Sequence, residues 1–308
     1  MADSQRDVKN RITSVKNIEK ITRAMEMVAA ARLRRAEQRI ESLRPYASAI
    51  RRMTRQAAEA AQNVPNLPIL NEHESENTVG LLLVTGDRGL AGAFNSQIVR
   101  AGIRAAAEHE SGGRSLAWYA SGRRGVSSLT FRGREVAGAY TGFTDRPSYG
   151  DARDIASDLI AAYVDGKVDR VEIIYNQYIS PLTQKVTRET LLPLQHATIL
   201  EGDEGLGGRA GGEEEEEDDG AKRALVEYEP DPEDILQRLI PAYVEISLYR
   251  ALLESTASEH GARMTAMRNA SQNAGDIIKD LTLQMNRERQ AEITQEILEV
   301  VSGTEGLR

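Results

Sequence analysis

Residues 232–303 most constrain what this chain can fold into, because they have the pattern of one uninterrupted helix of roughly 70 residues. At ~1.5 Å of rise per residue, such a helix runs about 105 Å, several times the width of a small globular domain. Its apolar and small residues recur alternately four and three positions apart, as in the seam of a coiled coil. A seam of this length needs a second helix to cover it. Its positions are Leu253, Ala257, His260, Met264, Met267, Ser271, Ala274, Ile278, Leu281 and Met285.

The N-terminal segment, residues 1–62, supplies a candidate partner helix. It contains no glycine and one proline, Pro45, which we expect to kink the helix near Arg44. Its apolar residues recur at helical spacing, so both termini are predicted to be long helices. These apolar positions are Val8, Ile12, Val15, Ile18, Met25, Leu33, Ala36, Ile40, Leu43, Ala47, Ile50 and Ala57.

Equal rise per residue predicts the register of an antiparallel pair. If Ala57 lies opposite Ile235, then Val8 lies opposite about residue 284. The four-three seam stops at Met285, where the partner helix also ends. We therefore expect the two terminal helices to form an antiparallel coiled coil.

The C-terminal helix continues beyond this pairing with an apolar face that has no partner in the chain. A lone helical tip of this kind implies a socket in another protein. The preceding residues, 286–296, are strongly polar, and Arg289 falls on the line that joins Met285 to Ile293, so the contact is expected to mix hydrogen bonds with burial. The apolar residues of the tip are Ile293, Ile297, Leu298, Val300 and Val301.

The middle of the chain has a different pattern, in which short apolar strands alternate with helices. We expect strands at 79–85, 115–120, 136–140 and 168–178, and helices at 93–109, 123–130 and 149–164. Segment 183–191 alternates more strictly and is expected to be an edge strand. This order predicts a mainly parallel, Rossmann-like sheet domain covered by helices, spanning residues 78–200. The fold class is therefore α/β with a long coiled coil.

Residues 201–224 contain mostly glycine and acid, including the uninterrupted acidic run from Glu213 to Asp219. Charge repulsion and the near absence of apolar residues predict a disordered loop. A short strand is possible at 225–229, before Pro232 opens the long C-terminal helix at 232–303. Pro241 is expected to kink that helix early.

Composition narrows the function classes. There is no cysteine, which excludes disulfides and thiolate sites, and no apolar run reaches the ~18 residues of a membrane span. We expect a soluble or peripheral protein of the cytoplasm. Residues 1–60 are basic, with 14 Lys or Arg against 7 Asp or Glu, although the whole chain carries a formal charge of −8. This basic helix lacks aromatic residues for base stacking, which favours a coiled-coil flank over a nucleic-acid surface.

The most enzyme-like segment is the glycine-rich turn from Gly86 to Gly92. Its glycine spacing matches neither a dinucleotide-binding nor a phosphate-binding loop, and the phosphate-binding lysine is missing. We interpret it as a tight turn in which Asp87 and Asn95 bond backbone amides. The four histidines lack ligand spacing, so we expect no catalytic residue, no metal site and no cofactor, and His260 is expected to fix register on the seam.

Several long motifs occur in order along nearly the whole chain. They are Arg11–Asn17, Ile21–Ala31, Arg44–Tyr46, Asp87–Leu90, Tyr228–Pro232, Leu281–Leu283 and Arg289–Ile297. Together these motifs resemble the gamma subunit family of bacterial F-type ATP synthases. The resemblance implies a non-catalytic rotor shaft that couples proton flow through the c ring to catalysis in the alpha and beta subunits. It also implies an epsilon partner, one copy per complex and a peripheral position on the cytoplasmic side of the plasma membrane.

The resemblance also assigns contact residues. Positions that match beta-contacting residues of the family are Met25, Arg289, Gln290 and Thr294. Tyr228 and Glu229 match the residues that contact the c ring. The apolar tip of Ile293, Ile297 and Val301 is expected to turn inside a bearing.

Two other classes of function remain compatible with the residues alone. One is a nucleotide-binding α/β enzyme with helical arms, which the Gly86–Gly92 turn would have to serve. The other is a static coiled-coil tether or a nucleic-acid-binding rod. Nucleotide binding to the isolated chain would indicate the first class, and salt-dependent binding to duplex DNA would indicate a nucleic-acid-binding rod.

Overall fold

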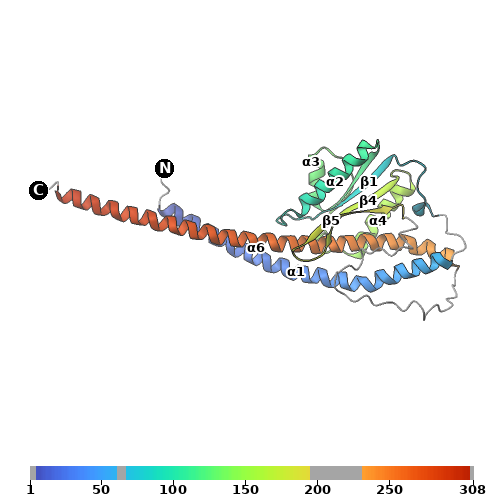
Figure 1. Ribbon diagram of the computed structural model, residues 1–308, viewed down its shortest axis with the longest axis horizontal. Helices are drawn as coiled ribbons and strands as arrows, with labels where there is room; N and C mark the ends of the chain where they lie inside the picture. The colour runs from blue at the N-terminus through green and yellow to red at the C-terminus, as the bar shows by residue number, and fades with distance from the viewer. Residues whose placement is uncertain (1–4, 61–66, 195–230, 306–308) are drawn as a thin grey trace. The chain divides into compact units, whose positions relative to one another are not determined.

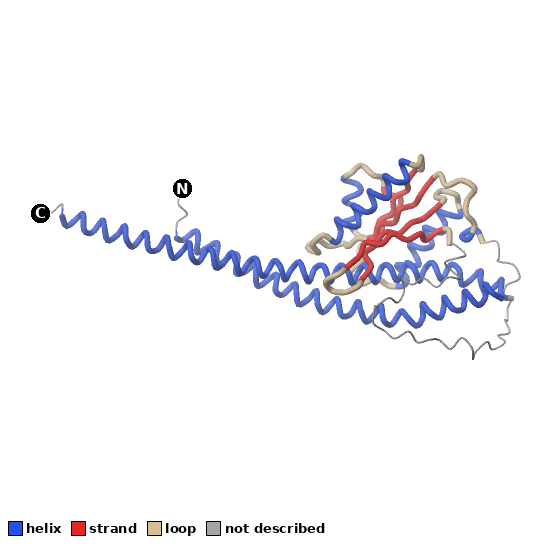
Figure 2. The backbone as a smooth tube through the Cα atoms, viewed as in Figure 1, coloured by secondary structure: helices blue, strands red, loops and turns tan. Residues whose placement is uncertain are grey.

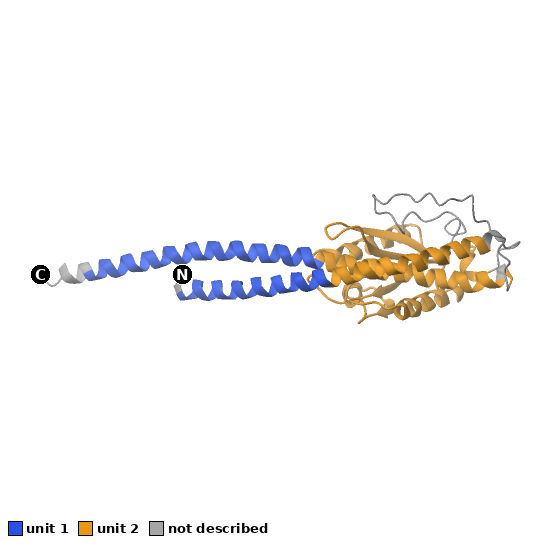
Figure 3. Cartoon of the chain, turned by 90° about the horizontal axis from the view of Figure 1, so that it is seen from below, with its two compact units in different colours: residues 1–31, 263–308 blue, residues 32–262 orange. Residues whose placement is uncertain are grey.

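The computed structural model describes residues 5–60, 67–194 and 231–305. The predicted acidic loop and the possible strand at 225–229 lie outside these ranges. The chain forms two compact units, residues 1–31 with 263–308 and residues 32–262 (Figure 3). Helix α1 (Gln5–Ala60) and helix α6 (Pro232–Glu305) each run through both units, whereas the sequence-based division treated each helix as a segment of its own.

The unit of residues 32–262 is built on a five-stranded sheet with the order β3-β2-β1-β4-β5. The pairs β1–β2, β1–β4 and β2–β3 are parallel, and β5 is antiparallel to β4, which confirms the mainly parallel sheet with an edge strand. The strands are β1 (Thr78–Val84), β2 (Ser115–Ser121), β3 (Val136–Tyr140), β4 (Arg170–Tyr178) and β5 (Gln184–Leu192).

Both faces of the sheet are covered, as the nearly continuous apolar run of β1 requires (Figures 1 and 2). Leu81 and Leu83 of β1 pack in a core with helices α2 (Phe94–Ser111) and α3 (Arg123–Phe131). Leu82 and Val84 point to the opposite core, because successive side chains of a strand alternate between faces.

The second core joins the sheet to helix α4 (Tyr149–Val164) and to both long helices, within the same unit. Ile50 and Ala57 of α1 and Leu236 and Val244 of α6 are buried there. A short 3-10 helix, Pro68–Leu70, contributes Ile69. The long helices are therefore partly a layer of the α/β fold. Both Pro45 and Pro241 lie inside continuous helices, and the kinks expected at these prolines stay predictions.

In the unit of residues 1–31 and 263–308, α1 and α6 pair as an antiparallel coiled coil (Figure 3). Val8, Ile12 and Leu281 are buried together, and Val15, Ile278 and Met285 pack against them. Val8 thus shares one cluster with Leu281 and Met285, and the contact of Thr22 with Ser271 agrees within one residue with the predicted register near residue 284.

The prediction was wrong at one seam position of α1. Ile18 was expected on the seam, but its side chain is 53% exposed, whereas Thr22 is 9% exposed. The regular repeat that begins at Val8 and Ile12 passes through Glu19 and Thr22, so Ile18 faces outward despite its apolar side chain.

Candidate functional site

The C-terminal tip of α6 offers an exposed apolar face. From Ala291 to Val300 every described side chain is exposed, and Ile293 and Ile297 are 48% and 58% exposed. The side chain of Val301 lies outside the described residues. Large apolar side chains repeated at helical spacing on one uncovered helix are typical of a surface that another protein covers.

The predicted polar contacts lie beside this apolar face. Arg289 and Gln290 are exposed, so their donors are available to a partner. Thr294 is also exposed, but its hydroxyl donates to the carbonyl oxygen of Gln290 at 2.8 Å. The structure therefore brings Gln290 and Thr294 to one face of the helix, one turn apart, as predicted.

Met25 lies at a different place, on α1 within the coiled-coil unit, and is half-buried. Its neighbour Glu26 accepts a hydrogen bond from Nε of Arg268 at 2.8 Å. Met27 and Val28 on the same helix are 63% and 53% exposed. Val28 lies one turn after Met25 and places an exposed apolar side chain beside it, which the sequence analysis missed because only seam positions were considered. Tyr228 and Glu229 lie outside the described residues.

The glycine-rich turn is organised by Asp87, which confirms its interpretation as a structural turn. Asp87 accepts hydrogen bonds from the backbone N–H of Arg123 at 3.0 Å and of Gly142 at 2.9 Å, and from the hydroxyl of Thr144 at 3.0 Å. Asn95 accepts one from the N–H of Gly86 at 2.8 Å. These bonds tie the end of β1 to the segments that follow β2 and β3.

The ionised form of Asp87 is stabilised by this arrangement. Burial opposes ionisation, but the N–H of Arg123, the hydroxyl of Thr144 and the N–H groups of Gly142 and Thr144 outweigh it, and the pKa of Asp87 lies below its ordinary value. With its carboxylate oxygens occupied by the protein's own donors, Asp87 is a structural group of the turn.

A second buried acid lies on α6. Glu254 is 8% exposed, and burial raises its pKa to about 7, opposed by the charge of Arg250 and assisted by that of Glu189. Nη2 of Arg250 donates to Oε2 of Glu189 at 2.7 Å, and the hydroxyl of Tyr175 donates to the other oxygen of Glu189 at 2.7 Å. Arg250 is thus hydrogen-bonded to Glu189, and burial makes ionisation of Glu254 costly.

The three histidines in the described ranges, His73, His109 and His260, serve the packing of the fold. His260 is 1% exposed, with Nε2 at 3.7 Å from Oδ1 of Asp145, so the seam histidine contacts a loop of the sheet domain. His109 lies 3.1 Å from Glu172, and His73 lies 2.8 Å from Asp169. Within residues 5–60, 67–194 and 231–305, no group of three or more His, Cys, Asp or Glu side chains could hold a metal ion.

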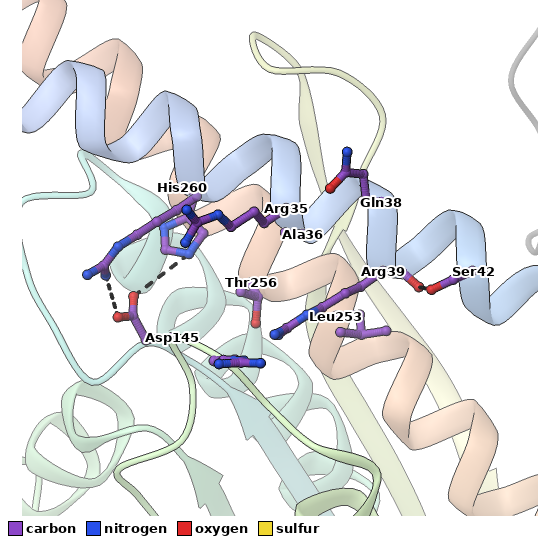
Figure 4. A pocket seen from close by; sticks show the side chains of 11 residues that line it. Arg35, Ala36, Gln38, Arg39, Ser42, Asp145, Leu253, Thr256 and His260 are labelled. Carbon is purple, nitrogen blue, oxygen red and sulfur yellow. Dashed lines mark hydrogen bonds and ion pairs between the residues drawn. The ribbon is translucent and has the colours of Figure 1, made fainter.

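The sequence analysis also missed a basic pocket of about 510 Å³ in the unit of residues 32–262 (Figure 4). Arg32, Arg35 and Arg39 of α1 and Arg146 of the loop after β3 line it, together with Asp145. The i, i+3 and i+7 spacing of Arg32, Arg35 and Arg39 on α1 was a detectable signal, but the fourth arginine joins them only through the fold.

Comparison with known proteins gives consistent matches. A family model described as ATP synthase matches residues 4–307. An ATP synthase gamma chain of Rubrobacter xylanophilus is 42% identical, covering 99% of this chain and 98% of the relative. An ATP synthase gamma chain of Streptomyces avermitilis is 40% identical, covering 100% and 97%.

Solved structures resemble the fold. The central stalk and c-ring structure of the Tetrahymena thermophila mitochondrial ATP synthase contains a chain that is 25% identical, with a TM-score of 0.56, covering 82% of this chain and 99% of that chain. A chain of the Euglena gracilis mitochondrial ATP synthase has a TM-score of 0.66 at 19% identity, covering 98% and 94%. Among the described helices, none is both long and apolar enough to span a lipid bilayer.

Proposed function

The chain belongs to the ATP synthase gamma chain family, and from this premise we propose that its own contribution to the complex is mechanical and non-catalytic. It is the central rotor shaft, which couples proton flow through the c ring to catalysis in the alpha and beta subunits. The observation that carries this function is the match to gamma chains over essentially the full length, including both terminal helices. The occupied carboxylate of Asp87 supports a structural role for the glycine-rich turn.

The mechanism follows from symmetry. A single chain has no threefold axis, so inside a ring of three catalytic subunits it must contact each of them differently. Different contacts give the three subunits different nucleotide affinities at any one angle. Rotation of the shaft then exchanges these states, and no reacting group on the shaft is needed.

Arg289, Gln290 and Thr294 are proposed to contact a beta subunit at one rotary angle. The exposure of these side chains supports the assignment, because a partner can reach them. The facing surface is expected to supply carboxylates, since a guanidinium that is buried without a partner carries a large desolvation cost. The apolar part of this bearing consists of Ile293, Ile297 and Val301. Met25 is proposed to face beta at a different place on the shaft, on α1.

Tyr228 and Glu229 are proposed to contact the c ring, and epsilon is a further partner. The complex then holds one copy of this chain at the cytoplasmic side of the bacterial plasma membrane. Replacement of both residues by alanine should reduce retention of the c ring and proton-coupled activity. Unchanged values for both would contradict this assignment.

The tip assignment is tested by the double variant Arg289→Ala with Gln290→Ala in the assembled complex. ATP synthesis and assembly should fall, whereas circular dichroism of the purified chain should be unchanged because neither side chain packs inside it. The matched control is Gln295→Ala with Glu299→Ala, two exposed residues on a different side of the same helix. Parental rotation and synthesis in the first variant would show that the apolar face alone forms the bearing.

A further inference from the structure

The basic pocket described above has no role in the shaft mechanism, and its charge is unbalanced. Four arginines and one aspartate line it, so the lining carries three net positive charges. Asp145 forms an ion pair with Arg32 and lies 3.6 Å from Nη1 of Arg88. The one carboxylate of the pocket is thus already engaged by cations.

The other three arginines are available to a ligand. Within the described ranges, the guanidinium groups of Arg35, Arg39 and Arg146 form no ion pair or hydrogen bond with the protein. Figure 4 shows Arg35 extending from α1 toward His260 and Arg39 extending toward Thr256. Like charges held around one opening repel each other, so an anion among them would relieve an unfavourable electrostatic arrangement.

A second cavity of about 400 Å³ adjoins the first and shares Arg39, Ser42 and Arg146 with it. Beyond these shared residues it is lined by aromatic side chains, including Tyr46 and Tyr149. The pocket therefore continues from a basic end to an aromatic end, and its volume is in the range of about 300–1,000 Å³ that is typical of small-molecule sites.

We propose that this pocket binds a polyphosphate group, held by Arg35, Arg39 and Arg146. Guanidinium groups match phosphate oxygens with paired, charge-assisted hydrogen bonds, and several converging arginines favour a ligand with several charges. A phosphate chain can also reach both cavities past the shared Arg39 and Arg146.

An acidic peptide fits the pocket less well. Much of the lining belongs to α1 and α6, whose backbone donors and acceptors are already used within the helices. An extended peptide would therefore find few main-chain partners, whereas a polyphosphate needs only side-chain donors.

A bound polyphosphate would connect three elements that meet at the pocket: α1, the loop after β3 and α6. Because it binds the folded chain and not the unfolded one, it would stabilise this arrangement in proportion to the logarithm of its concentration.

The test is calorimetric titration of the purified full-length chain with tripolyphosphate at fixed salt. We expect saturable binding with one site, and a loss of at least about tenfold in affinity in the double variant Arg35→Gln with Arg39→Gln. Arg100→Gln with Arg104→Gln is the matched control, because these are two exposed arginines with the same spacing on α2. Arg146→Gln should also weaken binding. Because Arg146 lies on the loop after β3, this loss could not be attributed to a change in α1.

Three results would overturn the proposal. One is no saturable binding at millimolar tripolyphosphate. Another is equal weakening by the control pair, which would indicate non-specific attraction to positive charge. The third is unchanged tripolyphosphate affinity together with failure of the Arg35 and Arg39 variant to assemble, which would assign these arginines to an acidic surface of another subunit.

A second titration, with ATP in place of tripolyphosphate, distinguishes a free polyphosphate ligand from a nucleotide. If ATP binds more tightly than tripolyphosphate, and Tyr46→Leu reduces only the binding of ATP, the aromatic cavity takes the base and the ligand is a nucleotide. If both ligands bind equally and Tyr46→Leu affects neither, the ligand is the polyphosphate alone. Both results support the site.

Discussion

The hydroxyl oxygens of Thr22 and Ser271 lie 2.7 Å apart, although the two residues are 249 positions apart in the chain. This hydrogen bond joins α1 to α6 inside the seam of the coiled coil. An apolar seam tolerates sliding by a heptad, whereas a buried polar pair is satisfied in only one register. Thr22 and Ser271 therefore define how the two terminal helices align.

The register can be tested by disulfide crosslinking, because the chain has no native cysteine. Val15→Cys with Ile278→Cys should form an intramolecular disulfide, since these residues pack in the same apolar cluster. Val15→Cys with Ile277→Cys should not, because Ile277 is 48% exposed on another side of α6. Mass spectrometry under non-reducing conditions measures both. Crosslinking of the Ile277 pair alone would require a different register.

Replacement of Asp87 by asparagine should destabilise the sheet domain. Asparagine cannot replace the charged acceptor that meets the N–H groups of Arg123 and Gly142, so we expect a loss of about 2 kcal/mol in the free energy of unfolding at pH 7. The pKa of Asp87 is lowered by folding, so its contribution is present above its unfolded pKa and is lost as pH falls through its folded pKa.

The difference between Asp87→Asn and the parent should therefore shrink in strong acid. Urea unfolding at pH 7 and below pH 4 measures it, with the exposed Asp280→Asn as control. An unchanged midpoint at pH 7 would show that the turn does not depend on this carboxylate.

Replacement of Glu254 by glutamine should stabilise the protein at alkaline pH. Folding raises the pKa of Glu254 from 4.5 to about 7, so the favourable contribution of its protonated form is present below pH 4.5 and is lost as pH rises through about 7. Glutamine keeps the shape without the charge, and the expected gain is on the order of 2–3 kcal/mol at pH 8.

At pH 4 the same substitution should have little effect, because the parent is then protonated in both states. Urea unfolding at the two pH values measures the change, and Glu292→Gln, an exposed carboxylate of the same helix, is the control. Equal stability of parent and Glu254→Gln at pH 8 would contradict a costly buried charge.

Replacement of Met25 by lysine should weaken coupling more than hydrolysis. The new cation lies next to the ion pair between Glu26 and Arg268 and replaces a half-buried apolar contact with a charge that resists burial. ATP synthesis driven by proton flow should fall by a larger factor than ATP hydrolysis. Met53→Lys, which alters an exposed methionine elsewhere on α1, is the control. An equal loss of both activities would indicate a general defect of assembly.

The sequence alone determined the helices and strands that follow from local, periodic patterns of apolar residues. The four-three seam from Leu253 to Met285 and the helical spacing from Val8 to Ala57 predicted both long helices and their antiparallel register, because rise per residue is constant. The apolar run of β1 similarly predicted a strand buried on both faces. The sequence analysis placed Ile18 on the seam because its side chain is apolar, although the repeat that begins at Val8 and Ile12 passes through Glu19 instead.

Only the tertiary structure decided which distant residues share an environment. Arg146 joins Arg35 and Arg39, and Asp145 approaches His260, because the loop after β3 lies against both long helices in the unit of residues 32–262. Loop placement depends on how the sheet packs, and no local periodicity encodes it. The raised pKa of Glu254 likewise depends on tertiary packing, because burial is its largest cause. A glutamate on a helix is ordinarily solvated, and this one resists ionisation because tertiary packing removes it from water and brings the negative charge of Glu189 near it.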